Sequence, residues 1–385
     1  MKHVDEFRDK HLAEGVLQRI EQLVPAAMHA LDRTPVARGG QPIKLMEVCG
    51  GHTHTIFKYG ITGLLPDDLE LVHGPGCPVC VLPMGRVDSA IALAQQPGVI
   101  FCTFGDAMRV PGSKLSLLQA KAQGADVRTV YSPSDALQLA REQPDRQVVF
   151  FGLGFETTAP STALVLREAR ASGVANFSVF CNHITIMPTL QSLLNAPELA
   201  LDGFVGPGHV SMVIGQRPYE IIAERYRKPL VIAGFEPLDI LQSVAMILQQ
   251  LIDRVARIEN QYTRAVQYAG SAPALAAMDE VFEPRPSFEW RGLGAIAHSG
   301  LQLRPRYRAF DAELRFGVCT ESQPDPKVCQ CGEVLKGSLQ PWDCKVFGTA
   351  CTPQTPIGAC MVSSEGACAA YYNYGRLATI RRRSA

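Results

Sequence analysis

The sequence carries no excess charge of either sign and no hydrophobic run long enough to cross a membrane. Lys and Arg number 37, as do Asp and Glu, so the formal net charge is zero. Without a basic stretch, the chain lacks the electrostatic footprint of a nucleic-acid-binding protein. The basic residues Arg381–Arg383 are interpreted as a solvated end. Apolar runs stay below the roughly 18–20 residues that span a bilayer, which excludes an integral membrane protein.

The N-terminal residues are charged and amphipathic, so they do not resemble a signal peptide. We therefore expect a cytoplasmic protein. At 385 residues, with 46% hydrophobic and 19% charged residues, the chain is expected to form two or three globular domains. Cysteine, in contrast, is plentiful, with 12 residues. In a reducing compartment, clustered cysteines indicate metal binding or redox chemistry rather than structural disulfides.

Apolar periodicity predicts an α/β protein. Residues 3–31 have the spacing of one helix, and a loop follows from Thr34 to Pro42. Short apolar runs then alternate with helical stretches, one of which is Leu238–Arg254. Continuous apolar strands between helices indicate parallel sheets covered on both faces. The predicted strands are Lys44–Val48, Leu69–His73, Val99–Phe104, Val127–Tyr131, Val148–Leu153, Phe177–Cys181, Gly203–Val205 and Leu230–Ala233.

Glycine-rich turns recur in a similar order in two parts of the chain and suggest two α/β units of similar build. Gly74-Pro75-Gly76 is echoed by Gly206-Pro207-Gly208, and Phe104-Gly105-Asp106 by Gly234-Phe235-Glu236. We predict an N-terminal helix and linker (1–42), a first α/β domain (43–140) and a second (141–258), then a segment returning to the sheets (259–310) and a Cys-rich C-terminal domain (311–385). Within the return segment, Ala265–Tyr268 and Gly294–Ala297 are the predicted strands.

The first candidate motif surrounds Cys49, which follows a predicted strand. Open α/β sheets place ligands at the carboxyl ends of their strands. Gly50 and Gly51 permit a tight turn, and a helix beginning near Thr53 is expected to lower the pKa of the thiol. The thiolate binds metals and attacks electrophiles. His52 and His54 offer imidazole nitrogens nearby; a buried cysteine with two capping histidines is the alternative interpretation.

The second motif, Cys77-Pro78-Val79-Cys80, also follows a strand. Two intervening residues allow its sulfurs to form a disulfide or share a metal, as in thiol oxidoreductases. It could face Cys49 across one cleft.

A third stretch, Gly152–Pro160, only loosely resembles a phosphate-binding loop because it lacks the expected lysine. Its Glu156 is interpreted either as a proton-transfer or ligand-orienting group or as a helix cap.

Several further residues either have two possible roles or are expected to have a structural role only. His209 and the pair Asn182-His183 are either site residues or satisfied polar groups, whereas Cys102 and Cys181 lie inside apolar strands and are predicted to be inert.

The last motif is the C-terminal cluster, whose six cysteines are widely and irregularly spaced. That spacing favours an iron–sulfur cluster over zinc, which more often uses two close cysteine pairs. The six are Cys329, Cys331, Cys344, Cys351, Cys360 and Cys368.

Taken together, these motifs resemble the HypD family of hydrogenase-maturation proteins. The matching stretches are CGGHTHT at 49–55, GPGCPVC at 74–80, FGLGFETTAP at 151–160, CxCGEVLKG at 329–337 and CTPQTPIGACMVSSEGACAAYYNYG at 351–375. The resemblance implies two Rossmann-like domains joined to a C-terminal [4Fe–4S] domain. It also implies a transient complex with the small chaperone HypC, and a further partner, HypE, that delivers cyanide. Together these proteins build the Fe(CN)₂CO unit of [NiFe]-hydrogenase.

By this resemblance, Cys49 holds the iron with an N-terminal cysteine of HypC, and Cys77 and Cys80 form a nearby redox dithiol. Cys331 and Cys360 become a second redox pair beside the cluster, as in ferredoxin:thioredoxin reductase. Cys319 falls outside the family pattern and is assigned a structural role. The implied cluster ligands are Cys329, Cys344, Cys351 and Cys368, with 14, 6 and 16 residues between them.

We hypothesise that His52 donates a hydrogen bond to bound cyanide or steers protons. The overall expectation is a redox-active scaffold for metallocofactor assembly, and whether it is also an enzyme stays open. One alternative is a cluster-dependent thiol–disulfide oxidoreductase that acts on other proteins and does not need Cys49. Another is a zinc-stabilised binding module without redox activity.

Overall fold

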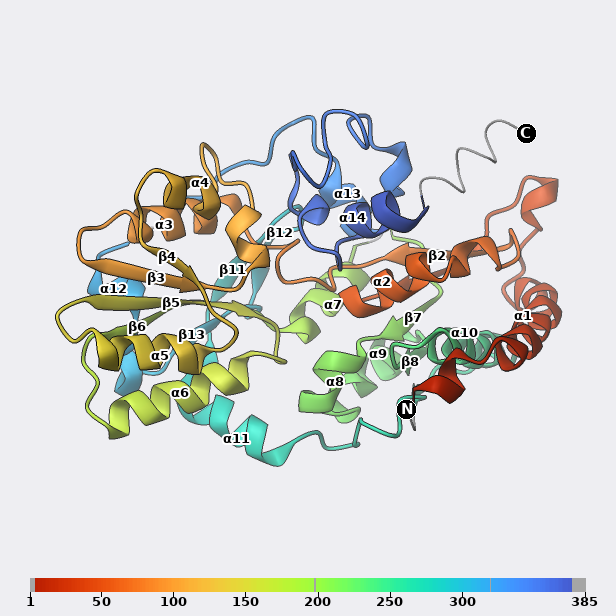
Figure 1. The fold of residues 1–385 in the computed structure, drawn as a ribbon. Coiled ribbons are helices and arrows are strands. Elements are labelled where there is room, and N and C mark those ends of the chain that lie inside the picture. The colour runs from red at the N-terminus through yellow and green to blue at the C-terminus, as the bar shows by residue number, and fades with distance from the viewer. Residues whose placement is uncertain (1–3, 197–198, 319, 376–385) are drawn as a thin grey trace.

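The computed structural model describes residues 4–196, 199–318 and 320–375, and it contains two parallel sheets (Figure 1). Sheet A has the strand order β2-β1-β7-β8-β9, and sheet B has the order β4-β3-β5-β6. All pairings within both sheets are parallel, which confirms the predicted α/β class. The strands are β1 (Ile43–Glu47), β2 (Leu69–His73), β3 (Val99–Thr103), β4 (Val127–Thr129), β5 (Gln147–Gly154), β6 (Phe177–His183), β7 (Gly203–Gly206), β8 (Leu230–Ile232) and β9 (Ile258–Asn260).

The sheets group the strands differently from the predicted units 43–140 and 141–258. Sheet A takes β1 and β2 from the first unit and β7 and β8 from the second, whereas sheet B takes β3 and β4 from the first and β5 and β6 from the second. The chain leaves sheet A after β2, completes sheet B and returns at β7. Glycine-rich turns recur because both sheets end their strands in the same way, so such turns do not reveal which sheet holds a strand.

Helices cover both faces of each sheet, as the apolar strands predicted (Figure 1). Against sheet A, α1 (Lys10–Ala30) packs on α10 (Pro237–Ile252) in a core shared with β1, β2, β7 and β8. The helix predicted over 3–31 is divided, because Asp9 leaves the helical conformation and caps α1 through the Leu12 N–H. The other α-helices are α2 (Gly50–Lys58), α3 (Met84–Ala94), α4 (Leu117–Ala122), α5 (Pro133–Glu142), α6 (Ala159–Ala171), α7 (Ile186–Leu194), α8 (Gly208–Ile214), α9 (Glu220–Tyr226), α11 (Ala272–Val281), α12 (Ala312–Arg315), α13 (Cys331–Leu335) and α14 (Ala367–Ala370).

Two small hairpins follow α11 and complete the return segment. One pairs β10 (Phe282–Pro284) with β13 (Leu301–Leu303), and the other pairs β11 (Ser287–Trp290) with β12 (Gly294–Ala297). The strand predicted at Gly294–Ala297 is therefore confirmed, whereas the one predicted at Ala265–Tyr268 is wrong, because this stretch forms a turn that packs Val266 into the core.

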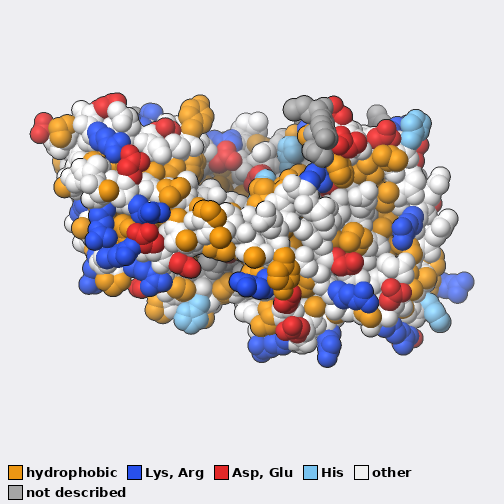
Figure 2. Space-filling model, turned by 90° about the horizontal axis from the view of Figure 1, so that it is seen from below, with side chains coloured by type: hydrophobic (Ala, Val, Ile, Leu, Met, Phe, Trp, Pro, Cys, Tyr) orange, Lys and Arg blue, Asp and Glu red, His pale blue; other side chains and the backbone are white. Residues whose placement is uncertain are grey.

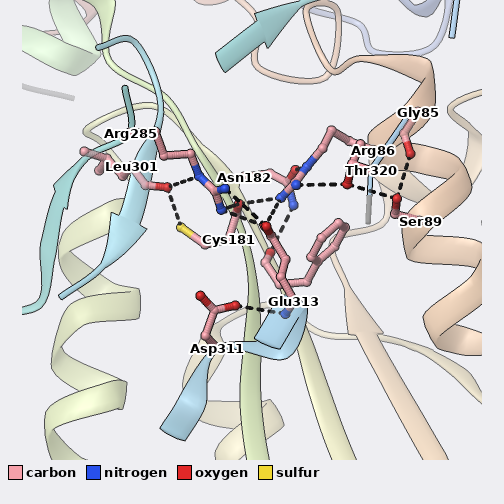
Figure 3. Close-up of polar contacts among 11 residues, drawn as sticks. Gly85, Arg86, Ser89, Cys181, Asn182, Arg285, Leu301, Asp311, Glu313 and Thr320 are labelled. Carbon is pink, nitrogen blue, oxygen red and sulfur yellow. Dashed lines mark hydrogen bonds and ion pairs between the residues drawn. The ribbon is translucent and has the colours of Figure 1, made fainter. Parts of the chain in front are cut away.

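A buried ionic cluster joins sheet B to α3 and α12 (Figure 3). Arg86 of α3 donates to Glu313 of α12 at 2.5 Å and to Cys181 O at 2.8 Å, and its guanidinium lies 4.2 Å from the Phe180 ring centroid. Arg285 donates to the same carboxylate at 2.6 Å. Because α12 belongs to this cluster, residues 311–315 are part of the sheet B layer rather than the Cys-rich region in which they were predicted.

The Cys-rich region lies across the carboxyl ends of both sheets (Figure 1). After β3 of sheet B, Arg109 donates to Val362 O at 2.7 Å, and Asp106 accepts from Ser363 at 2.9 Å. On the side of sheet A, a Cβ built on Gly50 would lie 2.5 Å from Glu365 Cβ. Residues 362–365 therefore bridge the two sheets. Cys319 and Arg381–Arg383 lie outside the described residues.

On the face shown in Figure 2, acidic and basic side chains are interspersed rather than gathered into a field of one sign. None of the helices in the described part of the chain combines the length and the apolar character needed to cross a lipid bilayer.

Candidate functional site

Cys49 and His209 lie at the switch point of sheet A. The neighbours of β1 in the sheet are β2 on one side and β7 on the other, and ligands of open α/β sheets bind where the strand order diverges in this way. Cys49 follows β1 and is the N-cap of α2, and His209 follows β7 in α8. Cys49 Sγ is 3.9 Å from His209 Nδ1. His209, which the sequence left undecided, thus belongs to the site.

Burial dominates the electrostatics of Cys49. Burial raises the pKa of its thiol to about 12, and the negative charges of Glu365 and Glu47 act in the same direction. The Gly51 N–H at the start of α2 lowers the pKa, but its effect is smaller. The sequence-based prediction of a lowered pKa is therefore wrong. Without a nearby cation this sulfur is a thiol at neutral pH.

Glu47 organises the surroundings of Cys49 and was not singled out from the sequence. Its side chain is fully buried. One carboxylate oxygen accepts from the Cys49 N–H at 3.0 Å, and the other accepts from His73 Nδ1 at 2.7 Å and from the Thr53 hydroxyl. A carboxylate at the end of an apolar strand is the signal that could have identified it, because a buried charge needs partners.

His52 is buried in α2, and its hydrogen bond defines its tautomer. Nε2 lies 3.1 Å from Ala233 O. Since a carbonyl only accepts, Nε2 carries the proton, and Nδ1 of the neutral ring is an acceptor. Nδ1 has no hydrogen-bond partner among the described residues, and burial lowers the pKa of the ring. This geometry contradicts the hypothesis that His52 donates to cyanide, whereas proton steering is compatible with a free acceptor nitrogen.

A pocket of about 420 Å³ opens beside the Cys49–His209 pair. His209 stacks on Phe235 with ring centroids 3.9 Å apart, and burial lowers the pKa of His209 to about 4. His209 is therefore neutral at physiological pH, and neutral imidazole is a metal ligand. The pocket is lined by Arg8, Gly51, His54, Thr55, Lys58, Tyr59, His209, Phe235, Glu236, Ser364 and Glu365.

The loop of the second motif packs directly against Cys49. The Gly50 N–H donates to Gly76 O at 3.2 Å. A Cβ built on Gly76 would lie 2.3 Å from Cys49 N, so only glycine permits this approach. Cys77 and Cys80 follow in the same loop and are buried. The fold therefore brings together the two motifs that the sequence placed at one cleft.

The thiols form a continuous series between the two ends of the chain. Cys80 interacts with Cys360 and Cys77, which raises the pKa of Cys80. Cys360 also interacts with Cys331, and its interactions with Cys331 and Cys80 lower the pKa of Cys360. Cys331 in turn interacts with Cys329. The series therefore runs from the loop beside Cys49 to the first of the predicted cluster ligands, and its members are present as free thiols.

Cys368 has the other three predicted cluster ligands, and also Cys331, among its neighbours. Burial raises the pKa of Cys368, and so do the charges of Cys331, Cys329, Cys351 and Cys344. The Ile357 N–H donates to Cys351 Sγ at 3.4 Å, a contact typical of cluster ligands. Among the described residues, no three Cys, His, Asp or Glu side chains converge on one metal ion. The donor set fits a cubane, in which each iron takes one protein sulfur.

Glu156 and the two strand cysteines belong to sheet B or to the turn that follows one of its strands. Glu156 follows β5 of sheet B and accepts from the Ile186 N–H at 3.1 Å; its second oxygen has no partner among the described residues. Burial raises its pKa to about 7. Cys102 and Cys181 are buried in β3 and β6, and burial raises the pKa of their thiols to about 12 and about 11, as expected of core residues.

Comparison with known proteins identifies the family to which the chain belongs. The HypD family model, described as "Hydrogenase formation hypA family", matches residues 22–375. Hydrogenase maturation factor HypD of Rhodobacter capsulatus is 58% identical over 379 residues, covering 97% of this chain and 98% of that protein. The protein of the same name from Escherichia coli strain K12 is 56% identical over 374 residues, with the same coverage. The chain therefore belongs to the HypD family of hydrogenase maturation factors.

Proposed function

We propose that this protein is a scaffold on which the Fe(CN)₂CO unit of [NiFe]-hydrogenase is assembled. The observation that supports it best is the Cys49–His209 pair, 3.9 Å apart at the switch point of sheet A and next to a pocket. A thiol whose pKa is about 12 gives up its proton when a metal cation replaces it, so the site stays inactive until iron arrives. Iron is the cargo of this site.

Cys49 supplies a soft thiolate, which suits low-spin iron that carries cyanide and carbon monoxide. His209 offers a neutral nitrogen from the adjacent strand end. By similarity to the family, a HypC-type chaperone adds a second thiolate in a transient complex, and a HypE-type partner delivers cyanide. The pocket beside Cys49 is the route that we assign to these groups. Free thiols throughout the site suit a cytoplasmic location.

The C-terminal cysteines are proposed to hold a [4Fe–4S] cluster, with Cys329, Cys344, Cys351 and Cys368 as ligands. When bound, the cluster supplies single electrons. The thiol series from Cys329 through Cys331, Cys360 and Cys80 to Cys77 gives these electrons a path toward Cys49. Reduction of a disulfide in this series consumes two electrons and two protons and yields two thiols. A one-electron donor of low potential must replenish the cluster.

The main rival is a thiol–disulfide oxidoreductase that acts on other proteins. Cys77 is 3% exposed and Cys80 is fully buried, so a protein disulfide cannot reach them without opening of the fold. Burial therefore disfavours this rival.

The test is anaerobic co-purification with the HypC-type partner, followed by infrared spectroscopy of the cyanide and carbonyl stretching region. Wild-type protein should show both sets of bands, and Cys49→Ala should show neither. Cys102→Ala, which alters a buried cysteine in sheet B, is the matched control and should resemble wild type. Bands of full intensity in Cys49→Ala would overturn the proposal. Colourless protein after anaerobic purification would favour the zinc alternative over the cluster.

A further inference from the structure

Arg291 is a buried cation at the junction of the two cysteine loops. It follows β11, and its side chain is 1% exposed. Its backbone N–H donates to Val81 O at 2.8 Å, one residue beyond Cys80. The next residue, Gly292, has a φ of +76° and packs against Gly332. A Cβ built on Gly332 would lie 2.9 Å from Gly292 Cα. Residues 291–292 thus contact the loop after Cys80 and the residue after Cys331.

The guanidinium of Arg291 is held in place but has one free donor. Nε donates to Asp325 at 2.6 Å, and Nη1 donates to Pro111 O at 3.3 Å. Nη2 has no hydrogen-bond partner among the described residues. Buried donors without partners are uncommon, so this N–H is open to an acceptor outside the chain, such as a water molecule or a bound group. Asp325 is 25% exposed, so water screens its negative charge more than the positive charge of Arg291.

Arg291 and Gly292 lie beside the cysteines of the C-terminal region, because Gly292 packs on Gly332, the residue after Cys331. In the same region, Asp325 lies four residues before Cys329, whose N–H donates to Pro326 O at 2.8 Å. The Arg291–Asp325 pair therefore also anchors the segment that leads into the predicted cluster ligands.

We propose that Arg291 is a positioning residue that sets the reduction potential of the C-terminal cysteine centre. This inference rests on the proposed [4Fe–4S] cluster. One-electron reduction adds one negative charge to the cluster and breaks no bond; the electron comes from the low-potential donor named above. A buried positive charge stabilises the reduced state, and Nη2–H is available to a sulfur atom of the centre. Arginine suits this position because its planar guanidinium can donate to Asp325, to Pro111 O and to a third acceptor at the same time.

The test is a spectroelectrochemical titration of the anaerobically purified full chain. Arg291→Gln removes the positive charge and should lower the reduction potential of the cluster. Asp325→Asn removes the opposing negative charge while leaving the Val81 and Pro111 contacts, and should raise the potential. Arg291→Lys should give a smaller shift than Arg291→Gln. Arg264→Lys, which alters a partly buried arginine paired with Asp239, is the control and should leave the potential unchanged.

Shifts of opposite sign in Arg291→Gln and Asp325→Asn support the inference, because a merely structural role does not predict a change of sign. If Arg291→Gln fails to fold, the inference is tested by Asp325→Asn alone, which should raise the reduction potential of the cluster. Equal potentials in wild type and Asp325→Asn, or a downward shift in Asp325→Asn, would overturn the inference while leaving the cluster assignment intact. Absence of any cluster in wild-type protein would overturn the proposed function, and this inference with it.

Discussion

At the scale of single residues, Cys49 shows two opposing effects on one thiol. A helix N-terminus stabilises a negative charge by about 0.3–1 kcal/mol. Burial with two nearby carboxylates raises the pKa from 9.0 to about 12, and three pKa units correspond to about 4 kcal/mol. Desolvation therefore outweighs the helix terminus, and the sulfur becomes a thiolate only when a cation compensates. Local sequence predicted this helix, with a start near Thr53 instead of the observed Gly50, but it could not reveal the depth of burial.

His52 is the residue for which a single substitution separates a ligand from a proton-transfer group. His52→Ala should keep the iron content of the purified complex and weaken its cyanide and carbonyl bands, because the free Nδ1 is lost while Cys49 remains. His52→Gln is the matched variant, since its amide can still donate to Ala233 O but does not titrate. We expect His52→Gln to restore packing without restoring the bands. Loss of all iron in either variant would make His52 a ligand.

Glu156 provides a pH-dependent test of burial. Its pKa is raised from 4.5 to about 7, so the folded protein keeps a proton that the unfolded chain releases between these pH values. The free energy of unfolding should therefore fall as pH rises from 4.5 to 7, by about 3 kcal/mol. Glu156→Gln should remove this fall, because the amide does not ionise and can still accept from the Ile186 N–H.

Urea unfolding of wild type and Glu156→Gln at pH 5 and pH 8 measures this difference. Glu142→Gln, on the exposed face of α5, is the control and should keep the wild-type dependence on pH. An identical change in stability for wild type and Glu156→Gln would show that Glu156 ionises freely in the folded protein.

Site residues could be predicted from the sequence where they belong to a local motif. They could not be predicted where strand pairing brings distant parts of the chain together. The cysteines and His52 follow from their spacing and from the ends of predicted strands. His209 follows a predicted strand but was left undecided, and Glu47 carries no such mark. His209 reaches Cys49 only because β7 pairs with β1, 160 positions apart in the chain. Glu47 matters because its carboxylate is buried and accepts hydrogen bonds from three donors. No local sequence pattern predicts that burial.

At the scale of helices and strands, the sequence predicted the elements better than their partners. Leu69–His73 is observed with the predicted bounds, and most other strands differ by one or two residues, because continuous apolar runs end where backbone turns reach the surface. Pairing depends on contacts between distant segments. The strands of both predicted units are therefore shared between the two sheets. β9 was missed because its three residues are only half-buried and lack an apolar run.

The ionic cluster in Figure 3 shows how such distant elements are joined. Arg86 is 5% exposed and binds α12 and the end of β6 from the first turn of α3. Arg86→Met keeps the aliphatic contact with Phe180 but removes every donor, and it should lower the free energy of unfolding by about 3 kcal/mol. Arg141→Met, which breaks the exposed pair with Glu168, should cost about 0–1 kcal/mol. Urea unfolding measures both, and equal costs would contradict the assigned importance of burial.

At the scale of the whole molecule, the two sheets direct the carboxyl ends of their strands toward the Cys-rich region. Arg109 and Asp106 bind residues 362–363 from sheet B, whereas Glu365 reaches Gly50 on sheet A. Cysteines that are 280 positions apart, Cys80 and Cys360, consequently interact with each other. The C-terminal region therefore does more than carry a predicted cluster: it packs against Gly50 next to Cys49 and connects the two groups of thiols.

That connection depends on Cys360, the residue between the two loops, and it can be interrupted there. With Cys77 and Cys80 oxidised to a disulfide, reduced viologen should deliver electrons to the cluster of wild-type protein, and both residues should become alkylatable after denaturation. Cys360→Ser should retain the visible absorption of the cluster, because Cys360 is not among the four proposed ligands, yet Cys77 and Cys80 should stay oxidised for far longer. Cys181→Ser, a buried substitution that can still donate to Leu301 O, is the control. Equally rapid reduction of Cys77 and Cys80 in Cys360→Ser would mean that electrons reach Cys77 and Cys80 by another path.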